Sequence, residues 1–190
     1  MMQPGVIHLT ASVYLFTEID RTVFIGLVWH PRLTCWMIPG GHVEAEPPSD
    51  AALRETREET GMAARLLPPP GPDLPAAYPH PQMARPWWTV RIPVAADNHA
   101  PEPHIHEDHQ YVAWMDRPDD PAGTAELVFR WASRESMGNL AMLAGTRMTA
   151  AYLISVVSAD TLEQVSQGHQ AQGVENLHDG RMRLRNDGHQ

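Results

Sequence analysis

Residues 40–62 read GGHVEAEPPSDAALRETREETGM, and they give the strongest indication of fold and chemistry in the chain. Within it Glu55, Glu58 and Glu59 stand at positions i, i+3 and i+4, which brings three carboxylates onto one face of a helix. A solvated acidic helix face is the ordinary explanation of a Glu-Glu pair. Three like charges repel one another, however, and a divalent cation offsets that repulsion. Carboxylate oxygens are the ligands that Mg²⁺ and Mn²⁺ prefer.

The local signals place the helix over residues 50–60. Ser49 or Asp50 is a suitable N-cap, prolines precede the helix where they are tolerated, and Gly61 follows the last turn. Arg54 precedes Glu58 by four residues, so the two side chains can pair and hold the carboxylate in one rotamer. The other side of the helix is semi-apolar and is expected to dock on a sheet; it carries Ala52, Leu53, Thr56 and Thr60.

The fixed offsets in this stretch resemble the Nudix box of the Nudix hydrolase family. They comprise Gly40, Glu46, the pair Arg54-Glu55, the pair Glu58-Glu59, and Gly61 followed by Met62. Two features depart from the family pattern. Thr56 stands where the family has a bulky aliphatic residue, and the turn before Glu46 is one residue short.

The resemblance implies an α/β fold, a Nudix-like α/β/α sandwich with a mixed β-sheet. It also implies metal-dependent hydrolysis of a phosphoanhydride bond in a nucleoside diphosphate linked to another moiety, most simply a nucleoside di- or triphosphate. ADP-ribose or a nucleotide sugar is the alternative substrate. A nucleotide-sensing module without turnover, or an isopentenyl-diphosphate isomerase, is the alternative function. The isomerase would need a catalytic cysteine, and Cys35 in an apolar strand is badly placed for that role.

The resemblance also assigns residues within the box. The metal ligands are Glu55, Glu58, Glu59 and a backbone carbonyl near Gly40, and the expected ion is Mg²⁺ or Mn²⁺. Arg54, Glu58 and Glu59 are the catalytic residues, with Arg54 orienting the glutamates. A carboxylate from outside the box often serves as general base in this family. Glu107 is the preferred residue, with Asp108 and Glu102 in reserve.

Composition restricts the partners of the chain. The net charge of the 190 residues is −9, which argues against nonspecific binding of nucleic-acid polymers. Small nucleotides stay possible as ligands. The single cysteine excludes disulfides within the chain, and the sequence predicts a cytoplasmic protein. Neither a secretory signal nor a run of apolar residues long enough for a membrane span is recognisable, so no membrane association is expected.

The pattern along the chain predicts strands, one helix, more strands and then helices. The expected strands are 8–16, 22–29, 35–38, 87–94 and 111–115, with a proline-rich loop over 66–86; the expected later helices are 123–136 and 147–166. A Nudix domain is therefore predicted over 1–136, a helical extension over 137–167 that packs on it or on a partner, and a flexible polar tail over 168–190. A homodimer through the C-terminal helices would cover the apolar residues Leu153, Ile154, Val156 and Val157.

Histidines gather at His104, His106 and His109, just before the strand predicted at Tyr111. They could bind a metal, but the sequence shows no companion ligand cluster of the kind that a zinc site needs. An exposed loop is the simpler interpretation. For the substrate, Trp88 and Tyr111 are candidates for stacking on a base, and Arg85 for meeting a phosphate.

Overall fold

A computed structural model describes residues 6–116, 118 and 125–156 of the chain. Its strands are β1 (Ile7–Ile19), β2 (Thr22–His30), β3 (Cys35–Met37), β4 (Gly40–His42), β5 (Arg65–Leu67), β6 (Trp88–Val94), β7 (His104–Trp114) and β8 (Phe129–Ser133). Its helices are α1 (Pro48–Thr60), α2 (Arg134–Met137) and α3 (Ala144–Val156). Among these described residues, no helix has both the length and the apolar character that a bilayer crossing requires.

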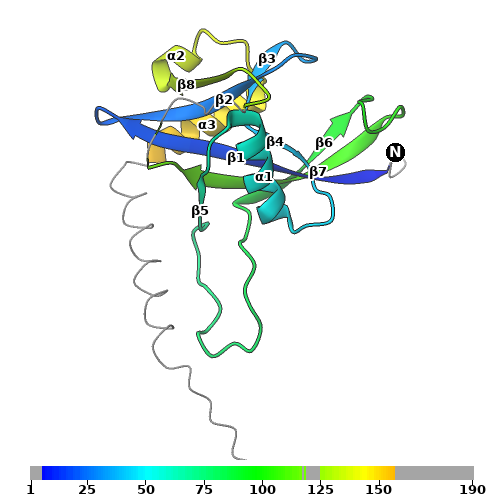
Figure 1. Cartoon of the computed structure of the whole chain (residues 1–190), viewed down its shortest axis with the longest axis vertical. Helices are drawn as coiled ribbons and strands as arrows, with labels where there is room; N and C mark the ends of the chain where they lie inside the picture. The colour runs from blue at the N-terminus through cyan, green and yellow to red at the C-terminus, as the bar shows by residue number, and fades with distance from the viewer. Residues whose placement is uncertain (1–5, 117, 119–124, 157–190) are drawn as a thin grey trace, which may run out of the picture.

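The strands form one mixed sheet (Figure 1). The order along its main path is β3-β2-β1-β7-β5, while β4, β6 and β8 pair with β1, β7 and β2 respectively. β1 and β7 run parallel, and the other pairs are antiparallel. The long parallel β1–β7 pair lies at the centre, so its two faces must both be covered.

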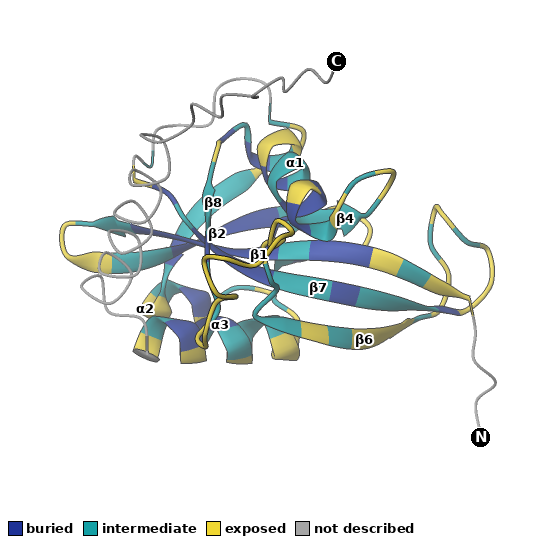
Figure 2. Cartoon of the chain, turned by 90° about the horizontal axis from the view of Figure 1, so that it is seen from below, coloured by how far each residue is buried: buried dark blue, intermediate teal, exposed yellow. Residues whose placement is uncertain are grey.

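Helices cover the two faces of this central pair (Figure 2). Residues alternate between the faces along each strand, so Ala11, Val13 and Leu15 meet α1 while Tyr14 and Phe16 meet α3. Ala150 and Leu153 of α3 are fully buried in the second cluster. The predicted α/β/α sandwich with a mixed sheet is confirmed.

Part of the apolar run that was predicted to form a dimer surface packs against the core of its own chain. Leu153 is buried in the core of its own sheet, and Ile154 packs against the same cluster. These two residues need no partner chain to cover them, and the homodimer stays a prediction. Of the other two residues of the run, the side chain of Val156 and all of Val157 lie outside the described part of the structure.

The helix predicted over 123–136 is wrong. Residues 129–133 form strand β8, paired antiparallel with β2, and only Arg134–Met137 are helical. The aromatic residues Phe129 and Trp131 have a high strand propensity and favour a strand once β2 offers an edge. They contact each other edge to face at 5.1 Å and pack against the α1-side cluster. Residues 119–124 lie outside the described part of the structure.

The second predicted helix, over 147–166, begins earlier than expected. α3 starts at Ala144, so that Gly145 lies inside the helix. Its described part ends at Val156, and residues 157–166 of the prediction lie outside the described residues. The predicted extension and tail over 137–190 therefore remain predictions as a division of the chain.

Two further expectations need correction at the sheet. The first two residues of the predicted proline-rich loop, 66 and 67, belong to strand β5, and the rest of the loop extends far from the sheet (Figure 1). Residues 104–109 are not an exposed loop but the start of β7, where His104 is buried. β7 extends seven residues further toward the N-terminus than expected because it pairs with both β1 and β6 there.

Candidate active site

The site is built where β4 meets α1. β4 pairs antiparallel with β1, with Ser12 opposite Gly40 and Ala11 opposite Gly41. Gly40 has a φ of +155°, and a Cβ there would lie 2.5 Å from the carbonyl oxygen of Ala11. A Cβ on Gly41 would lie 2.5 Å from the carboxylate of Glu55. Glycine is therefore required at Gly40, where a side chain would collide with the backbone of β1. At Gly41 a side chain would displace the carboxylate of Glu55, which lies directly against this backbone.

α1 begins at Pro48, two residues before the predicted start. Its N-cap is Pro47 and not Ser49 or Asp50, and no side chain caps it. The end agrees with the prediction. Gly61 has a left-handed φ of 71°, and its N–H donates to the carbonyl of Arg57 at 2.8 Å.

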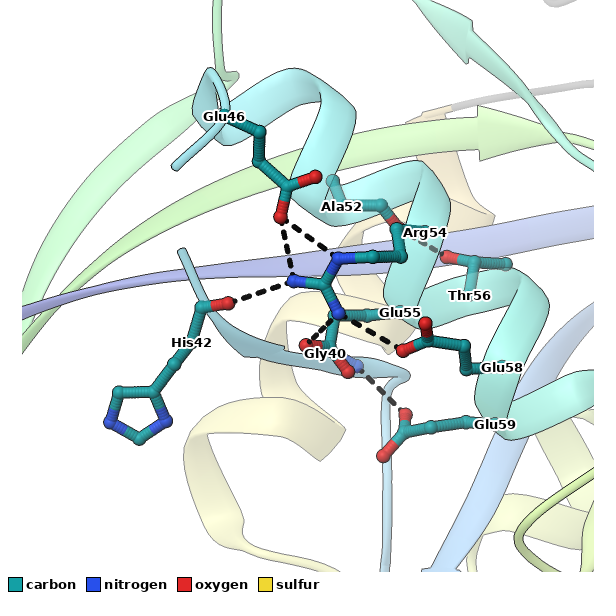
Figure 3. A network of polar contacts seen from close by, with 9 residues as sticks. All are labelled: Gly40, His42, Glu46, Ala52, Arg54, Glu55, Thr56, Glu58 and Glu59. Carbon is teal, nitrogen blue, oxygen red and sulfur yellow. Dashed lines mark hydrogen bonds and ion pairs between the residues drawn. The ribbon is translucent and has the colours of Figure 1, made fainter. Parts of the chain in front are cut away.

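Arg54 is the hub of the site (Figure 3). Its guanidinium donates to Glu46 at 2.7 and 2.9 Å, to Glu55 at 2.7 Å and to Glu58 at 3.0 Å. A further N–H donates to the backbone carbonyl of His42 at 3.0 Å. These contacts, with that to Glu46 foremost, raise the pKa of Arg54 above its ordinary value. One cation thus ties two box carboxylates to the turn that leads into the helix.

Glu59 faces a different partner. It accepts a hydrogen bond from the backbone N–H of Gly40 at 2.9 Å (Figure 3). Burial is the main reason that the pKa of Glu59 rises to about 7, and the charges of Glu55, Glu126 and Glu58 add to it while the Gly40 bond opposes it. Burial also raises the pKa of Glu55, against the effect of Arg54. Negative charge is therefore costly at the centre of this site in the absence of a cation.

Thr56 fits the helix in place of the bulky aliphatic residue. Its side chain is fully buried, and its hydroxyl donates to the carbonyl of Ala52 at 2.7 Å. Thr60, also buried, donates to the carbonyl of Thr56 in the same way at 2.5 Å. Both hydroxyls are satisfied within the helix, so the semi-apolar side of α1 can pack on the sheet without an unpaired polar group.

Two acids near the site carried too weak a sequence signal to be assigned. Glu46 has no role predicted from the sequence beyond its place in the motif, but it forms an ion pair with Arg54 at 2.7 Å, as short as that of Glu55. Glu126 lies in the segment before β8, and its N–H donates to the carbonyl of Glu58 at 3.0 Å. Its charge contributes to the raised pKa of Glu59. Glu126 is 67 residues beyond Glu59 in the sequence, and only the fold brings them together.

Glu107 and Asp108, two of the three acids proposed outside the box, lie on opposite faces of β7. Glu102 is exposed just before this strand and stays a prediction. Alternation places Glu107 on the face that carries α1, where its carboxylate accepts hydrogen bonds from Arg91 at 2.9 and 3.0 Å. Asp108 lies on the other face and is buried. It accepts hydrogen bonds from Thr10 at 3.0 Å, Ser12 at 2.5 Å and Gln110 at 3.0 Å. Asp108 is therefore excluded as a base acting beside α1, and Glu107 stays a prediction.

The structure separates the three proposed substrate residues. Tyr111 is only 2% exposed and packs in the α1-side core, so its ring cannot stack on a ligand, and that interpretation is wrong. Trp88 is half-buried on the opposite face, edge to face with Tyr14 at 6.5 Å. Arg85 lies in the long loop, 3.7 Å from Asp73. Trp88 and Arg85 stay predictions.

A model of the NUDIX domain matches residues 6–135, which is well over half of the chain. The chain belongs to the NUDIX domain family. The family resemblance expected from residues 40–62 is thereby confirmed, and the NUDIX domain includes all the strands and α1.

One curated relative matches part of this NUDIX protein. A Lactococcus lactis subsp. cremoris (strain MG1363) protein named probable DHNTP pyrophosphohydrolase is 42% identical over 62 residues. These residues are 32% of this chain and 35% of the relative, so the match spans about a third of either protein.

Solved structures share the fold over most of their length. A NUDIX family hydrolase from Clostridium perfringens has a TM-score of 0.57 at 21% identity, over 78% of this chain and 97% of that one. The C. elegans Ap4A hydrolase has a TM-score of 0.52 at 18% identity, over 80% and 98%. The E. coli dihydroneopterin triphosphate pyrophosphohydrolase has a TM-score of 0.54 at 14% identity, over 78% and 96%. At these identities the likeness shows the fold alone.

Proposed function

We propose that this chain is a metal-dependent pyrophosphohydrolase that cleaves a phosphoanhydride bond in a nucleoside di- or triphosphate. The observation that carries the proposal is the placement of three carboxylates on one face of α1: Glu55 and Glu58 bond to Arg54, and Glu59 bonds to the backbone N–H of Gly40. Arg54 offsets part of the negative charge, while burial and the neighbouring acids make a charged Glu59 costly without a cation. A site of this kind is suited to a divalent cation.

The residues present fit Mg²⁺ or Mn²⁺. Glu55, Glu58 and Glu59 supply hard oxygen ligands, and a backbone carbonyl near Gly40 is proposed as a further ligand because Gly40 lies against Glu59. A bound divalent ion would screen the charge of the phosphate bridge and activate a water molecule for attack. Arg54 would hold Glu55 and Glu58 in place without reaching the substrate itself.

Proton transfer needs a base near the attacking water. Glu59 is the first candidate, because its carboxylate bonds to the backbone of Gly40 and is not held by Arg54. Glu126 is now a second candidate beside Glu107, because its charge already acts on Glu59 whereas Glu107 is paired with Arg91. Glu107→Gln and Glu126→Gln, compared for kcat and its pH profile, would separate the two.

The names of similar proteins guide the choice of substrates to be tested. Dihydroneopterin triphosphate and Ap4A, from the relatives described above, belong in any panel. ADP-ribose also belongs there, because the NUDIX domain of Shewanella oneidensis NrtR was solved with that ligand and shares the fold at a TM-score of 0.51. A sensing module without turnover is the alternative function, and the retention of all three box glutamates favours an enzyme.

The proposal is tested by supplying purified full-length protein with Mg²⁺ and a panel of nucleoside triphosphates, Ap4A, ADP-ribose and dihydroneopterin triphosphate. Released phosphate and pyrophosphate are measured separately. Hydrolysis that requires the metal is expected for at least one triphosphate. Binding of a panel member without any metal-dependent release of product would instead support the sensing module.

A further inference from the structure

A second group of side chains that could bind a metal lies at the end of the sheet where β1 begins and β6 turns into β7 (Figure 1), and of its members only His42 belongs to the stretch 40–62. We call it the histidine cluster; it consists of His8, His42, Asp97, His104 and His106. Its members come from β1, β4, the β6–β7 turn and β7. The sequence shows only the His104-His106 pair, and the fold supplies the companion ligands that the pair lacked.

Three ligand atoms of the cluster already form a triangle. Nε2 of His104 lies 3.0 Å from Nε2 of His106, and Oδ2 of Asp97 lies 3.3 Å from each of them. Tetrahedral Zn²⁺ with ligand bonds of about 2.0–2.1 Å keeps its ligand atoms about 3.3–3.4 Å apart. The triangle therefore has nearly the size of one face of a zinc coordination tetrahedron.

A fourth ligand is within reach of this triangle. The ring nitrogens offered by His8, His104 and His106 all lie within 4.8 Å of one another, as do the ligand atoms of His42, Asp97 and His106. The rings of His8 and His104 are 4.6 Å apart between centroids. His8 is therefore the candidate for the fourth ligand.

Outer contacts hold the triangle in a state that can bind a metal. Nδ1 of His104 lies 3.0 Å from the carbonyl of Glu102, which fixes the tautomer that leaves Nε2 free as a ligand. The other carboxylate oxygen of Asp97 accepts the N–H groups of His99 and Ala100 at 2.8 and 2.9 Å, so Oδ2 faces the histidines. The side chains of His104 and Asp97 are 1% and 4% exposed.

We propose that Asp97, His104 and His106, completed by His8, bind one transition-metal ion of the Zn²⁺ type at a structural site distinct from the box. Buried imidazoles suit Zn²⁺ or Co²⁺ far better than Mg²⁺, which prefers oxygen ligands and keeps its waters. Four protein ligands leave no open position for a substrate, as in structural sites.

The site would stabilise the turn that leads into the box. His8 Nδ1 lies 3.3 Å from Nε2 of His42, and the carbonyl of His42 accepts a hydrogen bond from Arg54. An ion bound at the cluster would therefore anchor the end of β4, next to Gly40 and Gly41, without contacting the box carboxylates.

The test uses the full-length protein without a polyhistidine tag, prepared metal-free and then titrated with Co²⁺ in the presence of excess Mg²⁺. Wild type should bind one Co²⁺ with the visible absorption of a tetrahedral nitrogen–oxygen site, and one equivalent of Zn²⁺ should abolish that absorption. His106→Gln, and separately His8→Gln, should weaken Co²⁺ binding at least ~100-fold. His109→Gln is the matched control, because His109 lies on the same strand but on the opposite face.

A fold control and a site control make the outcome decisive. In chelator, His106→Gln and wild type should unfold at similar temperatures, whereas added Zn²⁺ should raise the unfolding temperature of wild type and His109→Gln only. Glu59→Gln should keep the tetrahedral Co²⁺ signal whether or not the protein hydrolyses nucleotides, so the inference stands apart from the proposed activity. The absence of this signal in wild type, its persistence in both His8→Gln and His106→Gln, or its loss in Glu59→Gln would overturn the proposal.

Discussion

Replacing Arg54 by lysine tests whether this residue organises the box. Its guanidinium bonds to three carboxylates and to the carbonyl of His42, and a lysine ammonium has no fork with which to meet them together. We expect R54K to lose two charge-assisted contacts. Each is assigned about 1.5 kcal/mol, the lower end of the usual range, because the Arg54 side chain is 27% exposed.

The loss of about 3 kcal/mol of positioning free energy corresponds to a fall of ~10²-fold in turnover, at 1.36 kcal/mol for each factor of ten. The assay is kcat and KM at saturating Mg²⁺, together with a Mg²⁺ titration. The effect should fall on kcat and on the Mg²⁺ requirement more than on KM, since Arg54 is not expected to touch the substrate.

R57K is the matched control for R54K. Arg57 lies on the same helix, and its side chain is exposed. Wild-type kinetics are expected for R57K. If R54K kept kcat within threefold of wild type, or lowered it no more than R57K, the reasoning that Arg54 positions the glutamates would be refuted.

The remaining predictions concern Glu59, two glycines and α3. Burial raises the folded-state pKa of Glu59 from 4.5 to about 7, so the metal-free protein should lose stability as the pH rises between these values. Mg²⁺ affinity should fall below pH 7, where a proton competes for Glu59, and calorimetry in buffers of different ionisation enthalpy should detect proton release at pH 6 but little at pH 8.5. Gly40→Ala should lower the free energy of unfolding, measured in urea, by at least ~3 kcal/mol. Gly145→Ala should raise it by ~0.5–1 kcal/mol, because a Cβ there would have no atom within 4 Å. Leu153→Ala should cost ~2–5 kcal/mol and exposed Met148→Ala less than ~0.5 kcal/mol; equal effects would mean that α3 is not part of the domain core.

The box could be predicted from the sequence because its signals are local. Helical spacing brings Glu55, Glu58 and Glu59 to one face, and Gly61 ends the helix where expected. The ion pair between Arg54 and Glu58, which stand four residues apart on the helix, also follows from local spacing alone. What local reasoning missed within the box is the tie from Arg54 to Glu46, which depends on the path of the turn.

Residues outside the box could not be placed because their partners are distant in the sequence. Strand alternation does not say which face of β7 meets α1, and so Tyr111 was assigned to a ligand when it belongs to the core. β8 became a strand only because β2 offered it an edge. The histidine cluster joins positions 8, 42, 97 and 104, and no motif spacing could indicate such a site.

Glu59→Gln tests whether the carboxylates of α1 bind the metal ion that hydrolysis requires. The measurement is kcat for the best substrate of the panel, in saturating Mg²⁺, for wild type, Glu59→Gln and Glu135→Gln, which changes an exposed acid on α2. We expect Glu59→Gln to lower kcat by at least ~10²-fold and Glu135→Gln to leave it unchanged. A Glu59→Gln variant that folds and turns over at the wild-type rate would contradict the account.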